Sequence, residues 1–427
     1  MEKFDIVVIG SGVSGLIASC RAAEMGARVL VLEKMHKAGC KLLITGKGRC
    51  NITNTASQSE YFNYIRPKSK FLKHAFSNFF SKDIITLLQK NGVETTEERG
   101  GRVFPKSNKA SDVLEAILNQ AKANNVEIRY GSKVEKLIYD NNLSVQGVEY
   151  SQNGQFKRVL TGSVIICTGG MSYPATGSDG DGYTLAKSAG HTIEPVRPAL
   201  VPLETKGDIA KRLQGLSLKN VKAVVWVNGK KQREEFGEML FTHFGLSGPI
   251  ILTISRYVVD DLRSNHTVNI SIDLKPALDE NKLDNRLLRD LEEHSNKKVE
   301  NIAKLWFPKK IIPVFFDETA INPDKEGHQV TSKERRRIKM FMKELTFQIK
   351  GYRSFKEAII TAGGVPTTEI DSKTMCSKLI NNLYFAGEVI DLDGDTGGFN
   401  LQIAYSTGWL AGQSCAKALG YKDQPIC

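Results

Sequence analysis

A glycine-rich turn near the start of the chain constrains its fold more than any other feature. A β-type run at residues 4–9 leads into the sequence GSGVSG at residues 10–15, and a helical stretch continues to about Met25. Gly26 predicts the end of that helix, and residues 28–32 predict a second strand. Strand, turn, helix and strand together form one βαβ unit, whose two strands must be parallel.

The glycines of this turn and one acid after the second strand have distinct physical roles. Gly10 permits a tight turn, Gly12 lets the backbone approach a pyrophosphate, and Gly15 lets the helix pack against the strand. The N-terminus of the helix then faces the anion. Glu33 ends the second strand, where its carboxylate can accept hydrogen bonds from ribose hydroxyls. An acid at this place favours FAD or NAD over NADP, because NADP carries a 2′-phosphate.

The end of the chain decides between these two cofactors. Residues 383–386 predict a buried strand that ends in Gly387 and Glu388, and the sequence GGFNLQ at residues 397–402 opens a last helix that runs to about Leu419. This pattern resembles the second dinucleotide signature of FAD proteins, in which an acid after the strand holds the ribityl chain. The helix N-terminus then points at the pyrimidine edge of the flavin and stabilises the negative charge of the reduced ring. The sequence therefore predicts FAD.

Longer motifs along the chain complete a recognisable pattern. They are KLLITGKGRCNITN at residues 41–54, GRVFPKS at 101–107, TGGMSYPATGSDGDGY at 168–183, FTHFGLSGP at 241–249 and LYFAGEVIDLDGDTGGFNLQ at 383–402. Taken together, they closely resemble one family, the flavoproteins related to aminoacetone oxidases and flavin-dependent bile-acid reductases. The resemblance spans residues 4 to about 415, and it implies an FAD domain interrupted by a β-barrel-like domain that carries a helical lid.

Changes of character along the chain predict the same layout. The predicted fold class is α/β, with a two-part FAD-binding dinucleotide fold of the Rossmann type interrupted by a β-barrel-like domain that carries a small helical subdomain. After Pro195, Pro198 and Pro202 the chain becomes strand-rich. The expected domains are residues 1–195 and 356–427 for the two parts of the FAD domain, residues 196–274 and 325–355 for a β-rich inserted substrate domain, and residues 275–324 for the helical lid.

Periodicity and turn residues also predict individual elements. Helices are expected at about residues 69–91, 109–124 and 279–294. Residues 126–164 are expected to form an antiparallel meander, with a separate buried strand at residues 163–167 after it. In the insertion, strands are expected at residues 221–227, 268–272 and 345–350.

The resemblance also implies which residues hold the cofactor: Lys41, Gly46, Gly48, Arg49 and Asn51 would line the pyrophosphate and flavin, and the Val134 backbone would meet the adenine. Arg49 has a rationale of its own, because a fixed cation near a diphosphate neutralises charge with directed donors; the alternative is a surface arginine. The full set of predicted cofactor residues is Gly10, Gly12, Val13, Ser14, Gly15, Glu33, Lys34, Lys41, Leu42, Thr45, Gly46, Gly48, Arg49, Asn51, Val134, Thr168, Gly169, Gly170, Gly387, Glu388, Asp391, Gly398, Phe399, Asn400, Leu401 and Gln402.

Three residues are candidates for catalysis, and each has a structural alternative. Arg102 could clamp a substrate carboxylate, or it could form a structural salt bridge. Tyr173 could stack on the flavin or hydrogen-bond near it, or it could belong to the core. His243 could face the flavin as an acid or base, or it could be a hydrogen-bonded structural histidine. Because the flavin holds the redox chemistry, the protein needs to add only orientation and one acid or base.

Cysteine and histidine usage argues against two other chemistries. Seven cysteines, at positions 20, 40, 50, 167, 376, 415 and 427, form no CxxC pair, so we expect free thiols and no redox-active dithiol. The seven histidines do not cluster, so no metal site is expected. The chain also contains no secretory signal and no apolar run of the roughly 18 residues that span a bilayer, so we expect a cytoplasmic location and no membrane partner.

The leading functional hypothesis is an FAD-dependent oxidoreductase that acts on a small organic molecule. A second strand–GxGxxG–helix unit is absent after residue 15, so any NAD(P)H would dock transiently; the sequence leaves open whether the flavin exchanges electrons with NAD(P)H or with molecular oxygen. A third and more remote hypothesis treats the flavin as a structural or sensing element.

Net charge motivates the alternative to a small substrate, an FAD-dependent RNA-modifying enzyme that binds tRNA. The chain carries a formal charge of +12, and residues 196–355 hold 29 Lys and Arg against 21 Asp and Glu. The densest basic run is KERRRIK at residues 333–339. Such a run suits a phosphate-bearing partner, but it is also typical of a solvated helix face, and it lacks the interleaved aromatic residues on which bases stack. We therefore expect nucleic acid to be the less favoured partner.

Overall fold

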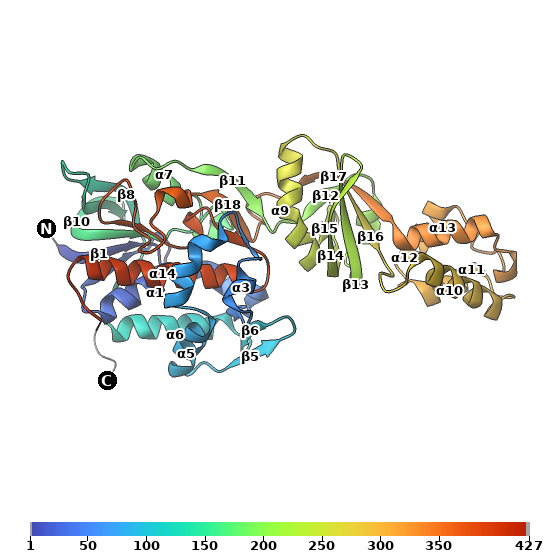
Figure 1. Cartoon of the computed structure of the whole chain (residues 1–427), viewed down its shortest axis with the longest axis horizontal. Coiled ribbons are helices and arrows are strands. Elements are labelled where there is room, and N and C mark those ends of the chain that lie inside the picture. Colours follow the sequence, from blue (N-terminus) through green and yellow to red (C-terminus); the bar gives the residue numbers. More distant parts are fainter. Residues whose placement is uncertain (1, 424–427) are drawn as a thin grey trace. The chain divides into compact units, whose positions relative to one another are not determined.

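The computed structural model describes residues 2–423, which form two compact units (Figure 1). The dinucleotide unit comprises the chain up to Pro198 together with the chain from Ile359 onward, and the barrel unit comprises Ala199–Ala358. The first contains a Rossmann-type sheet with helices, and the second contains a closed β-barrel. The predicted fold class, an α/β dinucleotide fold interrupted by a barrel, is therefore confirmed.

A seven-stranded sheet forms the centre of the dinucleotide unit. Its order is β7, β2, β1, β10, β9, β8, and β19 pairs with β10 beside this path. The strands are β1 (Lys3–Ile9), β2 (Val29–Leu32), β7 (Glu127–Arg129), β8 (Ser132–Tyr139), β9 (Val145–Gln152), β10 (Gln155–Ile166) and β19 (Leu383–Phe385). Ile9 pairs with Leu32 and Ile166, and Ile166 pairs with Phe385, so the parallel strands end in register. This register brings the two predicted dinucleotide signatures to the same edge of the sheet.

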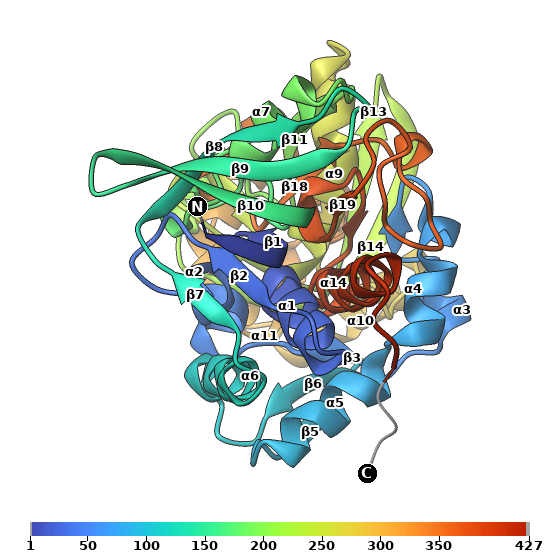
Figure 2. The same cartoon turned by 90° about the vertical axis from the view of Figure 1, so that its left-hand side faces the viewer.

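Two helices that carry those signatures pack against each other with their backbones in contact. Figure 2 shows α1 (Val13–Glu24) and α14 (Phe399–Ala418) side by side. A Cβ atom at Gly408 would lie 2.3 Å from the Ser14 carbonyl oxygen, and a Cβ atom at Gly412 would lie 2.2 Å from that of Ala18. Only glycine permits this approach, and it fixes the start of α14 relative to the start of α1.

Smaller elements surround the sheet. Helical segments are α2 (Cys40–Ile44), η1 (Thr45–Gly48), α3 (Gln58–Tyr61), α6 (Ala110–Ala123), η3 (Pro174–Thr176), α7 (Asp181–Ser188), η5 (Thr367–Glu369) and η6 (Gly387–Val389). Three small sheets are also present. The first contains β3 (Thr53–Asn54), β6 (Arg102–Pro105) and β5 (Thr95–Glu98). The second pairs β20 (Asp393–Gly394) with β4 (Ile65–Arg66), and the third pairs β11 (Glu194–Ala199) with β18 (Ile360–Gly364). The first two of these sheets border the start of α14, because Asn54 contacts Gly397 and β20 precedes the helix.

Two sequence-based expectations for this unit are wrong in detail. The helix expected at residues 69–91 is broken into η2 (Ser69–Leu72), α4 (Lys73–Asn78) and α5 (Ser81–Lys90). Phe79 is extended, with a φ of −153°, because its buried ring stacks on Trp409 of α14. The meander and the separate strand expected after it are one strand, β10, which pairs with β9 at its start and with β19 at its end. β7 lies outside the meander, parallel to β2.

The barrel unit closes six strands in the order β12, β15, β14, β13, β16, β17. They are β12 (Leu203–Thr205), β13 (Ser217–Val227), β14 (Lys230–Phe241), β15 (Gly245–Ser247), β16 (Val268–Asp273) and β17 (Leu345–Tyr352). Inward-facing residues such as Phe241, Ile270 and Phe347 are buried and form its core. Two helices, α8 (Ile209–Arg212) and α9 (Pro249–Arg263), lie between strands in the sequence.

A group of helices interrupts the barrel between β16 and β17, and Figure 1 shows them gathered at one end of it. They are α10 (Glu280–Glu293), α11 (Val299–Trp306), α12 (Ile311–Thr319), η4 (Gly327–Gln329) and α13 (Ser332–Lys343). The helix expected at residues 279–294 is confirmed, since Asp279 caps α10 by accepting a hydrogen bond from Lys282 N. Within residues 2–423, no helix is long and apolar enough to cross a membrane.

Candidate cofactor site

The glycine turn between β1 and α1 is the first component of the site. Gly10 has a φ of +96°, and a Cβ atom there would lie 2.8 Å from the Cys167 carbonyl oxygen. A Cβ atom at Gly15 would lie 2.0 Å from the Gly10 carbonyl oxygen. Both glycines are therefore required by packing of the chain itself. Gly12 is different, because a Cβ atom there would meet nothing within 4 Å in the described part of the chain.

Glu33 ties this turn to the end of β2. Its carboxylate is almost buried, and Oε2 accepts hydrogen bonds from both the backbone N and the hydroxyl of Ser11, each at 2.7 Å. The other oxygen, Oε1, accepts a hydrogen bond from Met35 N at 2.8 Å. These donors hold the carboxylate beside the N-terminal end of α1, the position expected of a ribose acceptor.

Lys34, the next residue, bonds to a loop far along the chain. Its ammonium group forms ion pairs with Asp179 and, at 2.7 Å, with Asp181 at the start of α7. Burial lowers the pKa of Lys34, but the hydrogen bonds and charges of both aspartates outweigh burial and leave that pKa above its ordinary value. The lysine is thus neutralised by the protein, which agrees with a ribose that carries no 2′-phosphate.

Glu388 forms the centre of the second component. The Lys41 ammonium group lies 2.6 Å from Glu388 Oε2 and 2.5 Å from Ser172 Oγ. Ser172 Oγ and Thr361 N both donate to Glu388 Oε1 at 2.8 Å. Ser172 and Thr361 were not among the predicted contacts, although Ser172 lies in the motif at residues 168–183 and Thr361 lies close to a pair of glycines, Gly363 and Gly364. Only the neighbouring glycines could have drawn attention to these two residues. Their residue type could not, because a serine or threonine beside glycines is usually a turn residue.

Contacts across these components join the two dinucleotide signatures. Gly387 has a φ of +78°, and a Cβ atom there would lie 2.6 Å from Ser14 Oγ at the start of α1. At the start of α14, a Cβ atom at Gly398 would lie 2.5 Å from the carbonyl oxygen of Thr53. Thr53 Oγ1 donates to Gln402 Oε1 at 2.7 Å, so β3 and the first turn of α14 are held together.

Hydrogen bonds hold the other predicted residues around α14. The amide of Asn400 donates to Gly394 O and accepts from Gly394 N, both at 2.7 Å. Asn51, with its amide nitrogen directed to Thr53 O, accepts a hydrogen bond from Gly398 N at 3.1 Å. In this arrangement Phe399 and Leu401 complete the first turn of the helix.

Predicted residues outside α14 occupy tight backbone turns or the sheet. Gly46 and Gly48 both have left-handed φ values, in a segment where Thr45 Oγ1 donates to Leu42 O. Thr168, Gly169 and Gly170 follow the end of β10, and a Cβ atom at Gly170 would lie 2.5 Å from Thr361 Oγ1. Val134 is buried in β8, Val13 begins α1, and Asp391 N donates to Val365 O. All the predicted cofactor residues thus lie in the dinucleotide unit.

Arg49 is engaged by protein groups. Its guanidinium forms an ion pair with Glu98, donates from Nε to Asn108 Oδ1 at 2.7 Å, and lies 4.1 Å from the centre of the Phe104 ring. This environment matches the alternative of a surface arginine held in an ion pair. A direct contact of Arg49 with the cofactor stays a prediction.

The three catalytic candidates occupy different settings. Tyr173 follows Ser172 directly and has a left-handed φ of +52° before Pro174, an uncommon backbone conformation for a bulky residue. Arg102 is half-buried in β6, and its Nε donates to Arg99 O at 3.1 Å. His243 lies in the barrel unit, where it is exposed and its ring meets the edge of Phe244. The structure thus places Tyr173, of the three, directly next to the Glu388 cluster.

Two features, added to the ribose acceptor at Glu33, show how FAD fits these residues. The space at Gly12 leaves the backbone at the start of α1 open, where N–H groups lack intrahelical partners and suit a pyrophosphate. The buried hydroxyl of Tyr183 has no hydrogen-bond partner within residues 2–423. Burial, together with the charges of Glu388 and Asp391, raises the pKa of Tyr183, so this hydroxyl stays a donor. An open anion site, ribose acceptors and a spare buried donor together fit FAD.

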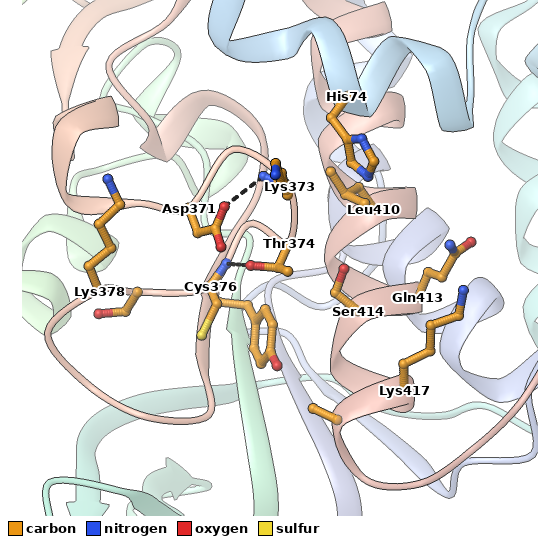
Figure 3. Close-up of a pocket in the computed structure, with 13 residues that line it drawn as sticks. His74, Asp371, Lys373, Thr374, Cys376, Lys378, Leu410, Gln413, Ser414 and Lys417 are labelled. Carbon is orange, nitrogen blue, oxygen red and sulfur yellow. Dashed lines mark hydrogen bonds between the residues drawn. The ribbon is translucent and has the colours of Figure 1, made fainter.

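A pocket of about 680 Å³ lies elsewhere in the dinucleotide unit (Figure 3). It is lined by Leu410, Gln413, Ser414 and Lys417 of α14 and by the loop that holds Asp371 and Cys376. Leu410 is roughly 16 Å along the helix from Phe399, at 1.5 Å per residue. None of the residues that line this pocket is a predicted cofactor residue, so it is separate from the site at the start of α14.

Cysteines and potential metal ligands were also predictable from the sequence, and their settings can be compared within residues 2–423. The six cysteines within residues 2–423 are free, while Cys427 lies outside the described residues. Burial raises the pKa of Cys50 and Cys167, which lie near the glycine segments, to about 12, so both are protonated thiols. In the described chain, no group of three His, Cys, Asp or Glu residues could hold a metal ion.

Comparison with known proteins gives matches over nearly the whole chain. A family model described as HI0933-like protein Rossmann domain matches residues 4–414. The 3-dehydro-bile acid delta(4,6)-reductase of Clostridium scindens is 31% identical over 414 residues, which cover 96% of this chain and 99% of that protein. The ribosomal RNA dihydrouridine synthase of Escherichia coli is 32% identical over 419 residues, which cover 98% of this chain and 99% of that protein.

A solved structure supports the fold. The 3-ketosteroid delta1-dehydrogenase from Sterolibacterium denitrificans, in complex with 1,4-androstadiene-3,17-dione, superposes with a TM-score of 0.52 at 14% identity. The match covers 98% of this chain and 100% of that chain. At this identity the likeness concerns the arrangement of the elements alone.

Proposed function

Because this chain belongs to the HI0933-like family of FAD-binding Rossmann proteins and is a flavin-dependent oxidoreductase, we propose that it reduces a carbon–carbon double bond conjugated to a carbonyl group. Both full-length relatives point to this bond type. One is by name a delta(4,6)-reductase of a 3-dehydro bile acid, in which the ketone activates the double bonds. The other makes dihydrouridine, whose ring differs from uridine by one saturated carbon–carbon bond next to a carbonyl.

The observation that carries the proposal is the cluster of Lys41, Ser172 and Glu388. Saturation of such a bond takes a hydride at one carbon and a proton at the other. FAD, when bound, supplies the hydride and draws its two electrons from NADH or NADPH. We propose Lys41 Nζ as the source of the proton; this atom lies 2.6 Å from Glu388 and 2.5 Å from Ser172, at the end of β19 where the ribityl chain is expected.

The remaining roles that we propose follow from the positions of the chain's own groups. Glu33 and the open backbone at Gly12 hold the adenosine and pyrophosphate, and Glu388 holds the ribityl chain. The start of α14 directs its backbone N–H groups toward the pyrimidine edge, which favours the negatively charged reduced ring. Of the three catalytic candidates, Tyr173, which has a left-handed conformation beside Ser172, is the one that we expect nearest to the substrate.

The leading substrate class is a small organic enone, and the second candidate is a uracil ring of ribosomal RNA. The second is favoured by the identity and coverage of the Escherichia coli relative and by the net charge of +12. Three of the five cations in the basic run of α13 add little to this second candidate, because they have partners in the protein. Arg335 pairs with Asp284 at 3.1 Å, Lys339 lies 3.6 Å from Glu280, and Arg337 donates to Thr319 O. These cations are used within the barrel unit, as on a solvated helix face.

Anaerobic reduction of the FAD-loaded protein tests the proposal. We expect NADH or NADPH to bleach the flavin absorbance, and a bound enone or uracil substrate to restore it with formation of a product heavier by two hydrogen atoms. A 3-keto-4-ene steroid and an unmodified ribosomal RNA transcript serve as the two probes, with mass spectrometry of each product. Absence of bleaching by both nucleotides would contradict the reductase and favour an oxidase that uses molecular oxygen.

A further inference from the structure

Tyr64 is an exposed aromatic residue that is held flat against the start of α14. Its ring stacks on Phe399, with the ring centres 4.5 Å apart and the planes inclined by 19°. Phe399 is the first residue of α14 and is buried, whereas 41% of the Tyr64 surface is exposed. Because Phe399 covers one face of the Tyr64 ring, the exposed surface belongs to the opposite face and the ring edge.

The ring is part of a rigid series of aromatic contacts. Phe399 meets the edge of Tyr61 at 4.7 Å, and Tyr61 in turn meets Phe76 and Phe80 in the core. The Tyr61 hydroxyl accepts a hydrogen bond from Asn54 N at 3.0 Å, which anchors the series to β3. An exposed tyrosine fixed in this way differs from an ordinary surface side chain, because its orientation is set before any ligand arrives.

Backbone contacts hold the same residue beside the second dinucleotide signature. The Tyr64 carbonyl oxygen accepts a hydrogen bond from Asp395 N at 2.9 Å, and the next residue, Ile65, pairs with Gly394 in the β4–β20 sheet. Gly397 and Gly398 follow within the same loop, and Asn400 bonds to Gly394. Tyr64 therefore lies beside the turn where the flavin ring is proposed to bind.

We propose that Tyr64 is a substrate-positioning residue, whose exposed face stacks on the flat conjugated part of the ring that carries the double bond. The inference rests on the proposed function, because conjugation of a carbonyl with a double bond holds these atoms of the reacting ring in one plane. A planar conjugated group gains more from a fixed aromatic face than from a flexible aliphatic one. The same chemistry occurs in a uracil base and in the enone ring of a steroid, so the platform suits either source.

Substitution of Tyr64 separates stacking from its other roles. Tyr64→Leu removes the aromatic face and keeps an apolar side chain over Phe399, while Tyr64→Phe keeps the face and loses only the hydroxyl. Phe156→Leu is the control for loss of an exposed aromatic residue, since Phe156 is 71% exposed on the β9–β10 hairpin. Each variant is loaded with FAD and titrated with two probes, a uridine-containing single-stranded RNA oligonucleotide and a 3-keto-4-ene steroid.

Two measurements are made on each variant: the Kd of each probe from the change in flavin absorbance, and the Kd of FAD. For the probe that binds, we expect Tyr64→Leu to raise Kd by about tenfold or more, the range typical of one lost stacking contact. Its FAD affinity should stay within about threefold of wild type, less than one such contact. Tyr64→Phe and Phe156→Leu should leave the Kd of the probe unchanged. In turnover, the loss should appear in KM and not in kcat.

The outcomes distinguish this inference from the proposed function. A wild-type protein that binds a probe through Tyr64 but never reduces it would overturn the proposed function and keep the platform. An unchanged probe Kd in Tyr64→Leu, or binding of neither probe to the wild type, would overturn the platform. A loss of FAD affinity in Tyr64→Leu would also overturn it, because Tyr64 would then support the cofactor.

Discussion

Both units have apolar cores, but close backbone contacts through glycine are concentrated in the dinucleotide unit. In the dinucleotide unit, close contacts join backbone to backbone through glycine, as between Gly15 and Gly10 or between Gly412 and Ala18. In the barrel unit, the interior is filled by large apolar side chains such as Phe241 and Phe347, whose ring centres lie 5.7 Å apart. Backbone contacts restrict a position to one residue type, whereas apolar packing accepts several residues of similar volume.

This difference between backbone contacts and apolar packing explains where along the sequence the family motifs are found. FTHFGLSGP is the one of the five family motifs that lies in the barrel unit, and it contains two such glycines. A Cβ atom at Gly245 would lie 2.2 Å from Leu203 O, and one at Gly248 would lie 2.7 Å from the Met239 Cα atom. Recognisable motifs therefore mark backbone contacts in both units, and the exposed His243 stands in the motif of the barrel.

The largest expected effect tests the side-chain packing of the barrel. Phe241→Ala should lower the free energy of unfolding of the barrel unit by about 3–5 kcal/mol, because it leaves a cavity beside Phe347. Phe241→Leu, which keeps most of the volume, should cost clearly less. Denaturant unfolding followed by circular dichroism measures both. Equal destabilisation of both variants would contradict the difference between the two units, because position 241 would then accept only one residue type, as a close glycine contact does.

The second prediction separates a glycine needed for packing from one kept for a ligand. Gly12→Ala should leave the stability of the FAD-free protein nearly unchanged, because nothing lies within 4 Å of the added atom in the described chain. It should weaken FAD binding about tenfold, roughly 1.4 kcal/mol, because the added methyl group occupies the approach to the pyrophosphate. Gly15→Ala is the matched variant, and it should destabilise the FAD-free protein itself.

Measurement of the FAD Kd by fluorescence titration, beside thermal unfolding of the FAD-free protein, decides the point. Equal FAD affinity in wild type and Gly12→Ala would show that the pyrophosphate does not approach this turn. Loss of stability in the FAD-free Gly12→Ala protein would show instead that both glycines serve packing.

The sequence predicted those parts of the fold that depend on local backbone contacts, and it missed those that depend on packing between distant side chains. The glycine turn, the end of β2 at Glu33 and the start of α14 each have local signals, and the structure brings them to one edge of the sheet. The break at Phe79 had no local signal, because it depends on stacking against Trp409, far along the chain. Local periodicity cannot report a contact of that kind.

The candidate site shows the same limit at the level of single residues. Glu388 was predictable because an acid after a buried strand has a known use. Its partners Ser172 and Thr361 were not, since their bonds to Glu388 join segments 216 and 27 residues away in the chain. Closure of the barrel likewise depends on pairing of Leu203 with Tyr352, which no local pattern indicates.

The smallest expected effect concerns Glu334, a carboxylate in the first turn of α13 in the barrel unit. Glu334 accepts hydrogen bonds from Lys325 Nζ at 2.8 Å and from Thr331, the residue that caps α13. Burial raises the pKa of Glu334, but the bonds from Lys325 and Thr331 outweigh it and lower that pKa from 4.5 to about 2. Its contribution to stability is therefore complete above pH 4.5 and is lost as the pH falls toward 2.

Glu334→Gln should thus lower the free energy of unfolding at pH 7 by about 1 kcal/mol, the size of a helix cap with a partly exposed ion pair. The variant should also lose part of the fall in stability between pH 5 and pH 3, because the unfolded wild-type chain takes up a proton there that the folded chain refuses. Glu318→Gln, at an exposed position of α12, is the control and should keep the wild-type slope. Equal slopes for both variants would mean that Glu334 is no better held than a surface carboxylate. Both variants should bind FAD with wild-type affinity. We expect the polar contacts of Glu334 to stabilise the barrel unit alone, whereas those of Glu33 and Glu388 support cofactor binding.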